Sequence, residues 1–139
     1  MEHVETHFIG KVAQKAIIEN SGKVLVCKGL QDSVWEFPGG RLNDNESPQD
    51  GLSREIVEEL GVPVTIHGPV HVCRSYHTKS NTWNIFIAYH CSIEKPGIEK
   101  ANLEEIEDVQ WVSFEELKNL PMFSDCRKAA DVFLQTHSA

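Results

Sequence analysis

Three glutamate side chains stand at helical spacing in the middle of the sequence: Glu55, Glu58 and Glu59. Positions i, i+3 and i+4 share one face of an α-helix, so these carboxylates should gather on one stretch of its surface. Like charges at this spacing repel one another, and oxygen-seeking divalent cations such as Mg²⁺ are the usual reason to collect them. The spacing therefore predicts a helix that carries a metal site; composition alone would allow a solvated, glutamate-rich surface helix instead.

The flanking residues predict where this helix begins and ends. Ser47 is a suitable N-cap, and Pro48 fits the first turn, where its missing N–H costs nothing. Gly61 suits a left-handed C-cap, and Pro63 follows it. We therefore expect a helix over residues 48–60. Its apolar stripe recurs every four residues: Leu52, Ile56 and Leu60.

The same stretch resembles the Nudix box, the signature of the Nudix hydrolase family. The family pattern is Gly, five residues, Glu, seven residues, then Arg-Glu-apolar-x-Glu-Glu-x-Gly-apolar. Residues 40–62 match it throughout, at Gly40, Glu46, Arg54, Glu55, Ile56, Glu58, Glu59, Gly61 and Val62. Seven fixed identities coincide by chance with odds on the order of 10⁻⁸ per starting position. The preceding WEFPGG also resembles the usual lead-in and is similar to the MutT-like branch.

The resemblance implies a role for each polar residue of the box. Arg54 matches an arginine that pairs with the box carboxylates and orients them, as outer-shell groups do in metal sites. Glu46 is expected in the same ion-pair network, whereas Ile56 and Val62 should be core residues without chemistry. The implied cofactor is Mg²⁺, with Mn²⁺ as a substitute. The implied metal ligands are the backbone carbonyl of Gly39 and the carboxylates of Glu55, Glu58 and Glu59.

The base that activates water differs between branches of the family, and the sequence leaves it open. Glu55 and Glu58 could serve. A glutamate from the acidic loop before Trp111 could serve instead, where related enzymes often place a further acidic ligand. Glu104 and Glu105 are the candidates there, and we prefer Glu105; the alternative is a solvated acidic loop. The expected catalytic residues are thus Arg54, Glu55, Glu58 and Glu105.

Recognition of the rest of the substrate must come from outside the box, because the box can act on any phosphoanhydride placed in it. Lys28 resembles a position where related nucleotide-cleaving enzymes carry a basic residue for phosphate; an ordinary surface charge is the alternative. Core or edge packing is likewise the alternative for each aromatic candidate. The aromatic side chains that could stack on a nucleobase are Trp35, Phe37, Tyr76 and Trp83.

The function that the resemblance implies is Mg²⁺-dependent cleavage of a nucleoside diphosphate linked to another moiety. A nucleoside triphosphate, split into a nucleoside monophosphate and pyrophosphate, is the preferred substrate. ADP-ribose, a nucleotide sugar or a dinucleoside polyphosphate is the alternative. A second alternative, from a different class, is a nucleotide-sensing Nudix module without catalysis; degenerate boxes mark that class, and this box is intact.

Composition bounds these expectations. At 139 residues the chain is expected to form a single domain, residues 1–139. A net charge of −8 argues against non-specific nucleic-acid binding, which relies on basic patches. No secretory signal or membrane-length apolar run is apparent, and the four cysteines are widely spaced. We therefore expect a cytoplasmic protein with reduced, mostly buried thiols and no membrane partner, either monomeric or homodimeric.

Hydrophobic patterning places the remaining elements around the predicted helix. An α/β fold follows, and the resemblance implies the Nudix fold, an α/β/α sandwich around a mixed β-sheet. Gly39 and Gly40 are expected in a loop, Gly68 and Pro69 at a bend, and residues 94–107 in a loop. The expected strands cover residues 8–19, 23–27, 70–77, 83–93 and 109–112, with short extended pieces at 35–37 and 64–66. The expected C-terminal helices begin at a Ser113 capping box and at Ser124.

Overall fold

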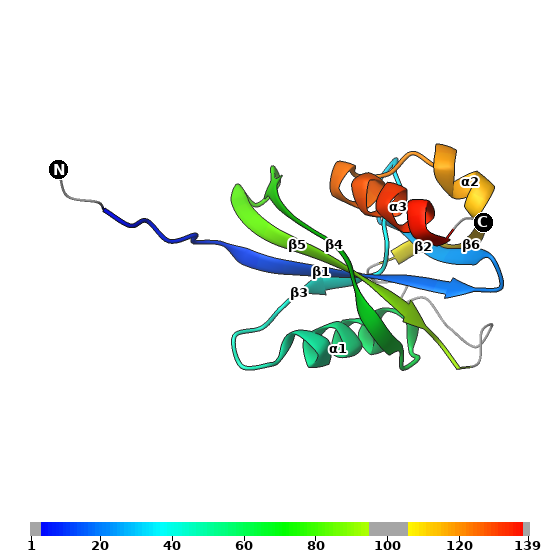
Figure 1. The fold of residues 1–139 in the computed structure, drawn as a ribbon, viewed down its shortest axis with the longest axis horizontal. Helices are drawn as coiled ribbons and strands as arrows, with labels where there is room; N and C mark the ends of the chain where they lie inside the picture. The colour runs from blue at the N-terminus through cyan, green and yellow to red at the C-terminus, as the bar shows by residue number, and fades with distance from the viewer. Residues whose placement is uncertain (1–3, 95–105, 138–139) are drawn as a thin grey trace.

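The computed structural model describes residues 4–94 and 106–137, which form the expected α/β/α sandwich (Figure 1). One helix covers one face of the sheet, and the other two cover the opposite face. The helices are α1 (Pro48–Leu60), α2 (Phe114–Asn119) and α3 (Ser124–His137). The strands are β1 (Lys11–Asn20), β2 (Lys23–Gly29), β3 (Gly39–Arg41), β4 (Thr65–His77), β5 (Thr82–Ser92) and β6 (Ile106–Ser113).

The sheet is mixed, as the resemblance implied. Its strand order is β4-β5-β1-β2-β6, and β3 pairs with β1 beside this path. Strands β1 and β5 run parallel, whereas β1–β2, β1–β3, β2–β6 and β4–β5 are antiparallel pairs. A parallel pair needs a long crossover, and here the chain between β1 and β5 includes α1.

The strands β1 and β2 separate soon after their hairpin, and this separation creates the place for β3. They pair at Glu19–Val24 and Asn20–Lys23. Farther along, β1 pairs with β3 instead, with Lys15 opposite Gly39. Glu36 meanwhile bridges to β2 through Cys27. The segment from Glu36 to Arg41 is therefore held between two strands, which fixes the glycine pair next to α1.

Two apolar clusters fill the two sides of the sheet. One lies between the sheet and α3, and the other between the sheet and α1. Ile56 is fully buried and Val62 is 2% exposed, so the prediction that these two box positions are core residues is confirmed. The α1 cluster is built around the predicted stripe of Leu52, Ile56 and Leu60.

The caps predicted from sequence are present. The Ser47 side chain accepts the Asp50 N–H at 3.3 Å, and Gly61 ends α1 in the left-handed conformation with φ +71°. A capping box joins Ser113 to Glu116 at the start of α2. These local signals were enough to place both helix ends of α1 correctly.

Three expectations about the strands were wrong. The glycine pair belongs to a strand, β3, because its missing side chains let this segment pair closely with β1. Gly68 and Pro69 do not bend the chain out of the sheet: they lie within β4, where two register shifts absorb them. β4 is an edge strand, so Pro69 removes no ladder hydrogen bond on its open side. Residues 8–10 precede β1, whose pairing with β5 starts at Lys11.

Other expectations have simpler outcomes. Strand β6 begins at Ile106, inside the stretch expected to be a loop. Glu104 and Glu105 lie outside the described residues. All four cysteines are free thiols, with Cys73 half-buried and the others buried, as expected. Among the described helices, none is long and apolar enough to cross a membrane.

Candidate active site

Arg54 is the centre of the charged network at the box. Its Nε and Nη2 donate to the two oxygens of Glu46 at 2.9 and 2.7 Å, a bidentate pair that joins α1 to the loop before it. Its Nη1 donates to Glu55 at 3.0 Å and to Glu58 at 3.2 Å. Its Nη2 also donates to the carbonyl of Arg41 at 3.3 Å. One arginine therefore contacts three glutamates and the end of β3, as expected for the pairing that the resemblance implied.

Glu46 is anchored from both sides. Besides Arg54, the backbone N–H of Asn43 donates to its Oε1 at 2.8 Å. These hydrogen bonds, first that from Arg54 and then that from Asn43, lower the pKa of Glu46 to about 2. Glu46 is therefore ionised at neutral pH, and its two hydrogen bonds position the guanidinium of Arg54.

The two glycines lie against the carboxylates of α1. The backbone N–H of Gly39 donates to Oε2 of Glu59 at 3.2 Å. A β-carbon at Gly40 would overlap the carboxylate of Glu55, and one at Gly39 would overlap the carbonyl oxygen of Gln14. Gly39 also has φ +146°, a conformation that side chains rarely adopt. Two carboxylates and the glycine backbone thus meet only because these positions lack side chains.

Burial raises the pKa of both carboxylates that face the glycines. The pKa of Glu59 rises to about 7, with burial the largest cause; the nearby ammonium of Lys15 and the Gly39 hydrogen bond oppose it. Burial also raises the pKa of Glu55, against the opposing effect of Arg54. Buried carboxylates without full compensation are costly to ionise, and such groups concentrate at functional sites.

The oxygen donors at this place suit a hard divalent cation. Carboxylate and carbonyl oxygens are the ligands that Mg²⁺ and Mn²⁺ prefer. As the side chains stand, the described residues contain no group of three or more His, Cys, Asp or Glu arranged to hold a metal ion. Arg54 instead pairs with Glu55 and Glu58. The Glu58 side chain is 51% exposed, so it can rotate without disturbing the core. The donor set therefore fits the implied cofactor.

Lys15 is a cation that the sequence reasoning missed. Its side chain is 15% exposed, and its Nζ donates to Glu36 at 2.6 Å and to the carbonyl of Gly39 at 3.5 Å. Burial lowers the pKa of Lys15, but Glu36 and the other acidic groups around the ammonium together raise it above its ordinary value. The one available signal was a lysine within the largely apolar run of β1, between Ala13 and Ile18.

The predicted substrate-binding residues fall into three environments. Phe37 is fully buried in the α3-side core, so it offers no surface for stacking in this structure. Trp35 is half-buried, and its backbone N–H donates to the carbonyl of Pro121 at 2.9 Å. The Nζ of Lys28 lies 5.2 Å from the centre of the Trp35 ring, so these two candidates lie side by side.

Tyr76 and Trp83 form an exposed aromatic pair at the end of the β4–β5 hairpin. Their ring centres are 5.2 Å apart, and the side chains remain 44% and 42% exposed. The guanidinium of Arg74 stacks over Trp83 at 4.1 Å. Of the four aromatic candidates, this pair offers the most surface to a ligand.

The hairpin turn is tied to β3 through Arg41, another residue the sequence reasoning missed. Its Nη2 donates to the hydroxyl of Ser80 at 2.8 Å and to that of Thr82 at 3.5 Å. Arg41 directly follows the glycine pair. The box and the hairpin that carries Trp83 are thus connected through one side chain.

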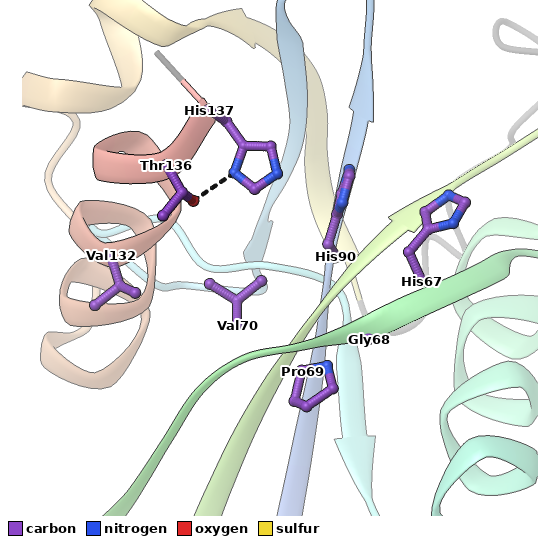
Figure 2. A pocket seen from close by; sticks show the side chains of 8 residues that line it. All are labelled: His67, Gly68, Pro69, Val70, His90, Val132, Thr136 and His137. Carbon is purple, nitrogen blue, oxygen red and sulfur yellow. Dashed lines mark hydrogen bonds between the residues drawn. The ribbon is translucent and has the colours of Figure 1, made fainter. Parts of the chain in front are cut away.

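A separate pocket of about 280 Å³ lies on the face of the sheet opposite α1 (Figure 2). It is lined by residues of β4, β5 and α3, and it contains none of the box residues. His90 stands between His67 and His137, with ring centres 5.0 and 4.8 Å away. Burial, followed by these two neighbours, lowers the pKa of His90. The pocket is therefore a feature of the α3 packing and distinct from the candidate active site.

Comparisons with known proteins agree with this geometry. A family model described as the NUDIX domain matches residues 11–132. The solution structure of the E. coli ORF135 protein superposes with a TM-score of 0.78 at 27% identity, covering 92% of this chain and 91% of that one.

Two curated relatives match over shorter stretches. The 8-oxo-dGTP diphosphatase of Proteus vulgaris is 61% identical over 58 residues, which are 39% of this chain and 52% of that protein. The CTP pyrophosphohydrolase of Escherichia coli (strain K12) is 42% identical over 55 residues, 37% of this chain and 41% of that protein. The match thus spans about half of each relative.

Proposed function

The chain belongs to the Nudix family, and on that premise we propose that it is a pyrophosphohydrolase that splits a nucleoside triphosphate into a nucleoside monophosphate and pyrophosphate. The observation that carries the proposal is the meeting of Glu55 and Glu59 with the Gly39–Gly40 backbone, oriented by Arg54. A non-catalytic module would not need this arrangement of buried, raised-pKa carboxylates.

The proposed reaction is the attack of water on a phosphorus atom of the anhydride. A new P–O bond forms, the bridging P–O bond breaks, and pyrophosphate leaves. A bound Mg²⁺ would neutralise the phosphate oxygens and help to aim the water. The residues that would hold it are Glu55, Glu58 and Glu59, with the carbonyl of Gly39.

The protein side chains have two further tasks in this proposal. Arg54 keeps Glu55 and Glu58 in place between substrate turnovers, and Glu46 keeps Arg54 in place. Glu55 or Glu58 would accept the proton of the attacking water; Glu105, the other candidate base, lies outside the described residues. Burial raises the pKa of Glu55, which makes its carboxylate a stronger proton acceptor than an ordinary glutamate.

A triphosphate is the proposed substrate because the two relatives described above are named for nucleoside triphosphates. The Trp35–Lys28 and Tyr76–Trp83 pairs are the proposed contacts for the nucleoside and its phosphates. The proposed setting is cytoplasmic, where nucleotides and Mg²⁺ are abundant.

A substrate panel tests the proposal. The purified protein is incubated with nucleoside triphosphates (including 8-oxo-dGTP), ADP-ribose, nucleotide sugars and dinucleoside polyphosphates, each with Mg²⁺, Mn²⁺ or excess chelator. We expect pyrophosphate and a monophosphate from a triphosphate, only with a divalent cation. Glu59→Gln is the matched negative control. Turnover of none of these compounds by the wild-type protein would contradict catalysis, and full activity in chelator would contradict the metal mechanism.

A further inference from the structure

His90 of β5 stands between two other histidines in the pocket beside α3 (Figure 2). Its ring centre lies 5.0 Å from that of His67 on β4 and 4.8 Å from that of His137 on α3. All three side chains line the cavity of about 280 Å³, which contains none of the box residues. Three imidazoles from distant parts of the chain therefore meet at a place to which the proposed catalysis gives no task.

His137 presents a ring nitrogen with a free lone pair. Its Nδ1 lies 3.0 Å from the carbonyl oxygen of Phe133 and 2.8 Å from the hydroxyl of Thr136, and that hydroxyl itself donates to the same carbonyl at 3.1 Å. A carbonyl can only accept, so Nδ1 carries the ring proton and Nε2 of the neutral ring does not. Figure 2 shows this Nε2 turned toward His90. Histidines that bind metals are commonly oriented in this way, by donating their other N–H to a backbone carbonyl.

The His90 ring is held by packing and is able to turn. Its contacts are with the rings of His67, Phe133 and His137, and among the described residues no hydrogen bond fixes its nitrogens. Burial, followed by the two neighbouring imidazoles, lowers its pKa, so the ring is neutral at neutral pH. A neutral imidazole is the form that binds a metal ion.

The separation of His90 and His137 suits two ligands of one ion. Imidazole nitrogens bind Zn²⁺ at about 2.0–2.1 Å, which places the ring centres of two ligands on a tetrahedral ion about 5 Å apart. The observed separation is 4.8 Å. The rings now meet edge to face, at an interplanar angle of 67°. A rotation of the His90 ring is therefore the change needed to direct one nitrogen of each side chain at the same point.

The charges around this pair favour a cation. Among the described residues that line the pocket, none is a lysine or an arginine. His137 lies in the last turn of α3, where the carbonyl ends of the helix attract positive charge. The carboxylate of Glu19 on β1 also acts on His90, in the direction that favours positive charge there. Imidazole donors select Zn²⁺, Ni²⁺ or Cu²⁺ over the hard cation Mg²⁺.

We propose that His90 and His137 bind a divalent transition-metal ion of the Zn²⁺ class, which ties the end of α3 to the sheet. Water in the pocket would complete the coordination of the ion. As the side chains stand, the described residues contain no group of three or more His, Cys, Asp or Glu arranged to hold a metal ion, so the proposal is limited to these two ligands. The site is separate from the cation site proposed at the box, and it does not depend on the proposed function.

The test is calorimetry of Zn²⁺ binding to the protein without a histidine tag, in excess Mg²⁺. Mg²⁺ occupies sites made of oxygen ligands and leaves imidazole sites free. We expect one Zn²⁺ per chain. His90→Gln and His137→Gln should each weaken binding by about tenfold or more, since each removes a ligand. Absence of Zn²⁺ binding by the wild-type protein, or wild-type affinity in both variants, would overturn the proposal.

His7→Gln is the matched control. It also removes a histidine, one that lies near Glu5 in the segment before β1, and it should keep the wild-type affinity for Zn²⁺. Thermal unfolding in excess Mg²⁺ gives a second measurement, because an ion that binds the folded state raises Tm. Zn²⁺ should raise the Tm of wild type and of His7→Gln, and it should leave that of His90→Gln and His137→Gln nearly unchanged. Scans without Zn²⁺ check that each variant folds.

Nitrogen NMR of the imidazole rings identifies the ligands directly. In the metal-free protein at neutral pH, His137 should carry its proton on Nδ1. Addition of Zn²⁺ should shift the signals of Nε2 of His137 and of one nitrogen of His90, and it should leave those of His7 in place. Zn²⁺-dependent shifts confined to other histidines would mean that the ion binds elsewhere and that the proposal is wrong.

Discussion

The carboxylate of Glu55 occupies the space that a β-carbon at Gly40 would fill. This contact joins the middle of α1 to β3, and it exists only because position 40 has no side chain. The three atoms nearest to such a β-carbon all belong to the flexible end of the Glu55 side chain. A larger residue would therefore displace this carboxylate, which the site needs, while the surrounding backbone can stay in place. Activity and stability should therefore separate at this position.

Gly40→Ala should lower kcat about 10–100-fold, the usual effect of disturbing the groups that orient metal ligands. Its unfolding free energy should change little, because only the end of the Glu55 side chain must move. Steady-state kinetics and urea unfolding measure the two effects. Glu55→Asp supplies the control, since its shorter side chain leaves room for the methyl group. Gly40→Ala should lower kcat by a smaller factor in the Glu55→Asp background than in the wild-type protein. Equal factors in the two backgrounds would mean that the contact between Glu55 and position 40 does not affect catalysis.

Arg54→Lys should also lower kcat about 10–100-fold while the fold is retained. Lysine keeps the charge but cannot bind Glu46 through two parallel hydrogen bonds and reach Glu55 and Glu58 as well. The matched control is Arg127→Lys, since Arg127 likewise donates through two nitrogens to an acid, Asp131, but on α3. The control should keep wild-type kinetics. Equal kinetic effects of the two substitutions would show that the Arg54 network has no special role.

The sequence predicted the parts of this site that depend on local spacing. Ser47, Gly61 and the recurrence of Leu52, Ile56 and Leu60 act within one helix, so they could place α1 and the carboxylates that it carries. The Arg54 network also follows from spacing, because its partners are on the same helix or on the loop that precedes it.

The parts that depend on contacts between distant segments could not be predicted. β3 exists because β1 and β2 separate, and Lys15 meets Glu36 across 21 positions of the chain. The exposure of an aromatic residue is also a tertiary property. Phe37 and Trp83 were equivalent candidates in the sequence, yet one is fully buried and the other is 42% exposed.

Glu59→Gln should abolish most activity and stabilise the protein at pH 8. The pKa of Glu59 is raised from its ordinary 4.5 to about 7, so the folded state holds this proton more tightly than the unfolded state does. The protein therefore loses stability as the pH rises from about 4.5 to about 7, and this penalty is complete above about pH 7 and absent below about pH 4.5. Removing the charge should add about 1–3 kcal/mol at pH 8.

The stability of wild type and Glu59→Gln is compared by urea unfolding from pH 4 to pH 8 in chelator, because a bound cation would favour the ionised form. The gain in unfolding free energy should grow between about pH 4.5 and pH 7, stay constant above about pH 7 and vanish below about pH 4.5. The same titration predicts that wild-type activity rises through about pH 7, since the carboxylates bind metal when ionised. A stability difference that does not depend on pH would contradict the raised pKa.

Trp83→Ala and Tyr76→Ala should alter the choice of substrate more than they alter the dependence on Mg²⁺. The two rings form an exposed pair, Arg74 stacks on one of them, and Arg41 ties their hairpin to β3. Stacking of a base on an aromatic side chain contributes roughly 1–3 kcal/mol, so KM should rise about tenfold while the Mg²⁺ concentration for half-maximal activity stays constant.

Val72→Ala is the matched control, because Val72 is an exposed apolar residue on the same strand as Tyr76, β4. The measurement is the ratio of kcat/KM for two competing triphosphates. If both aromatic variants keep the wild-type ratio of kcat/KM, the nucleoside does not stack on this pair, and its contacts lie elsewhere.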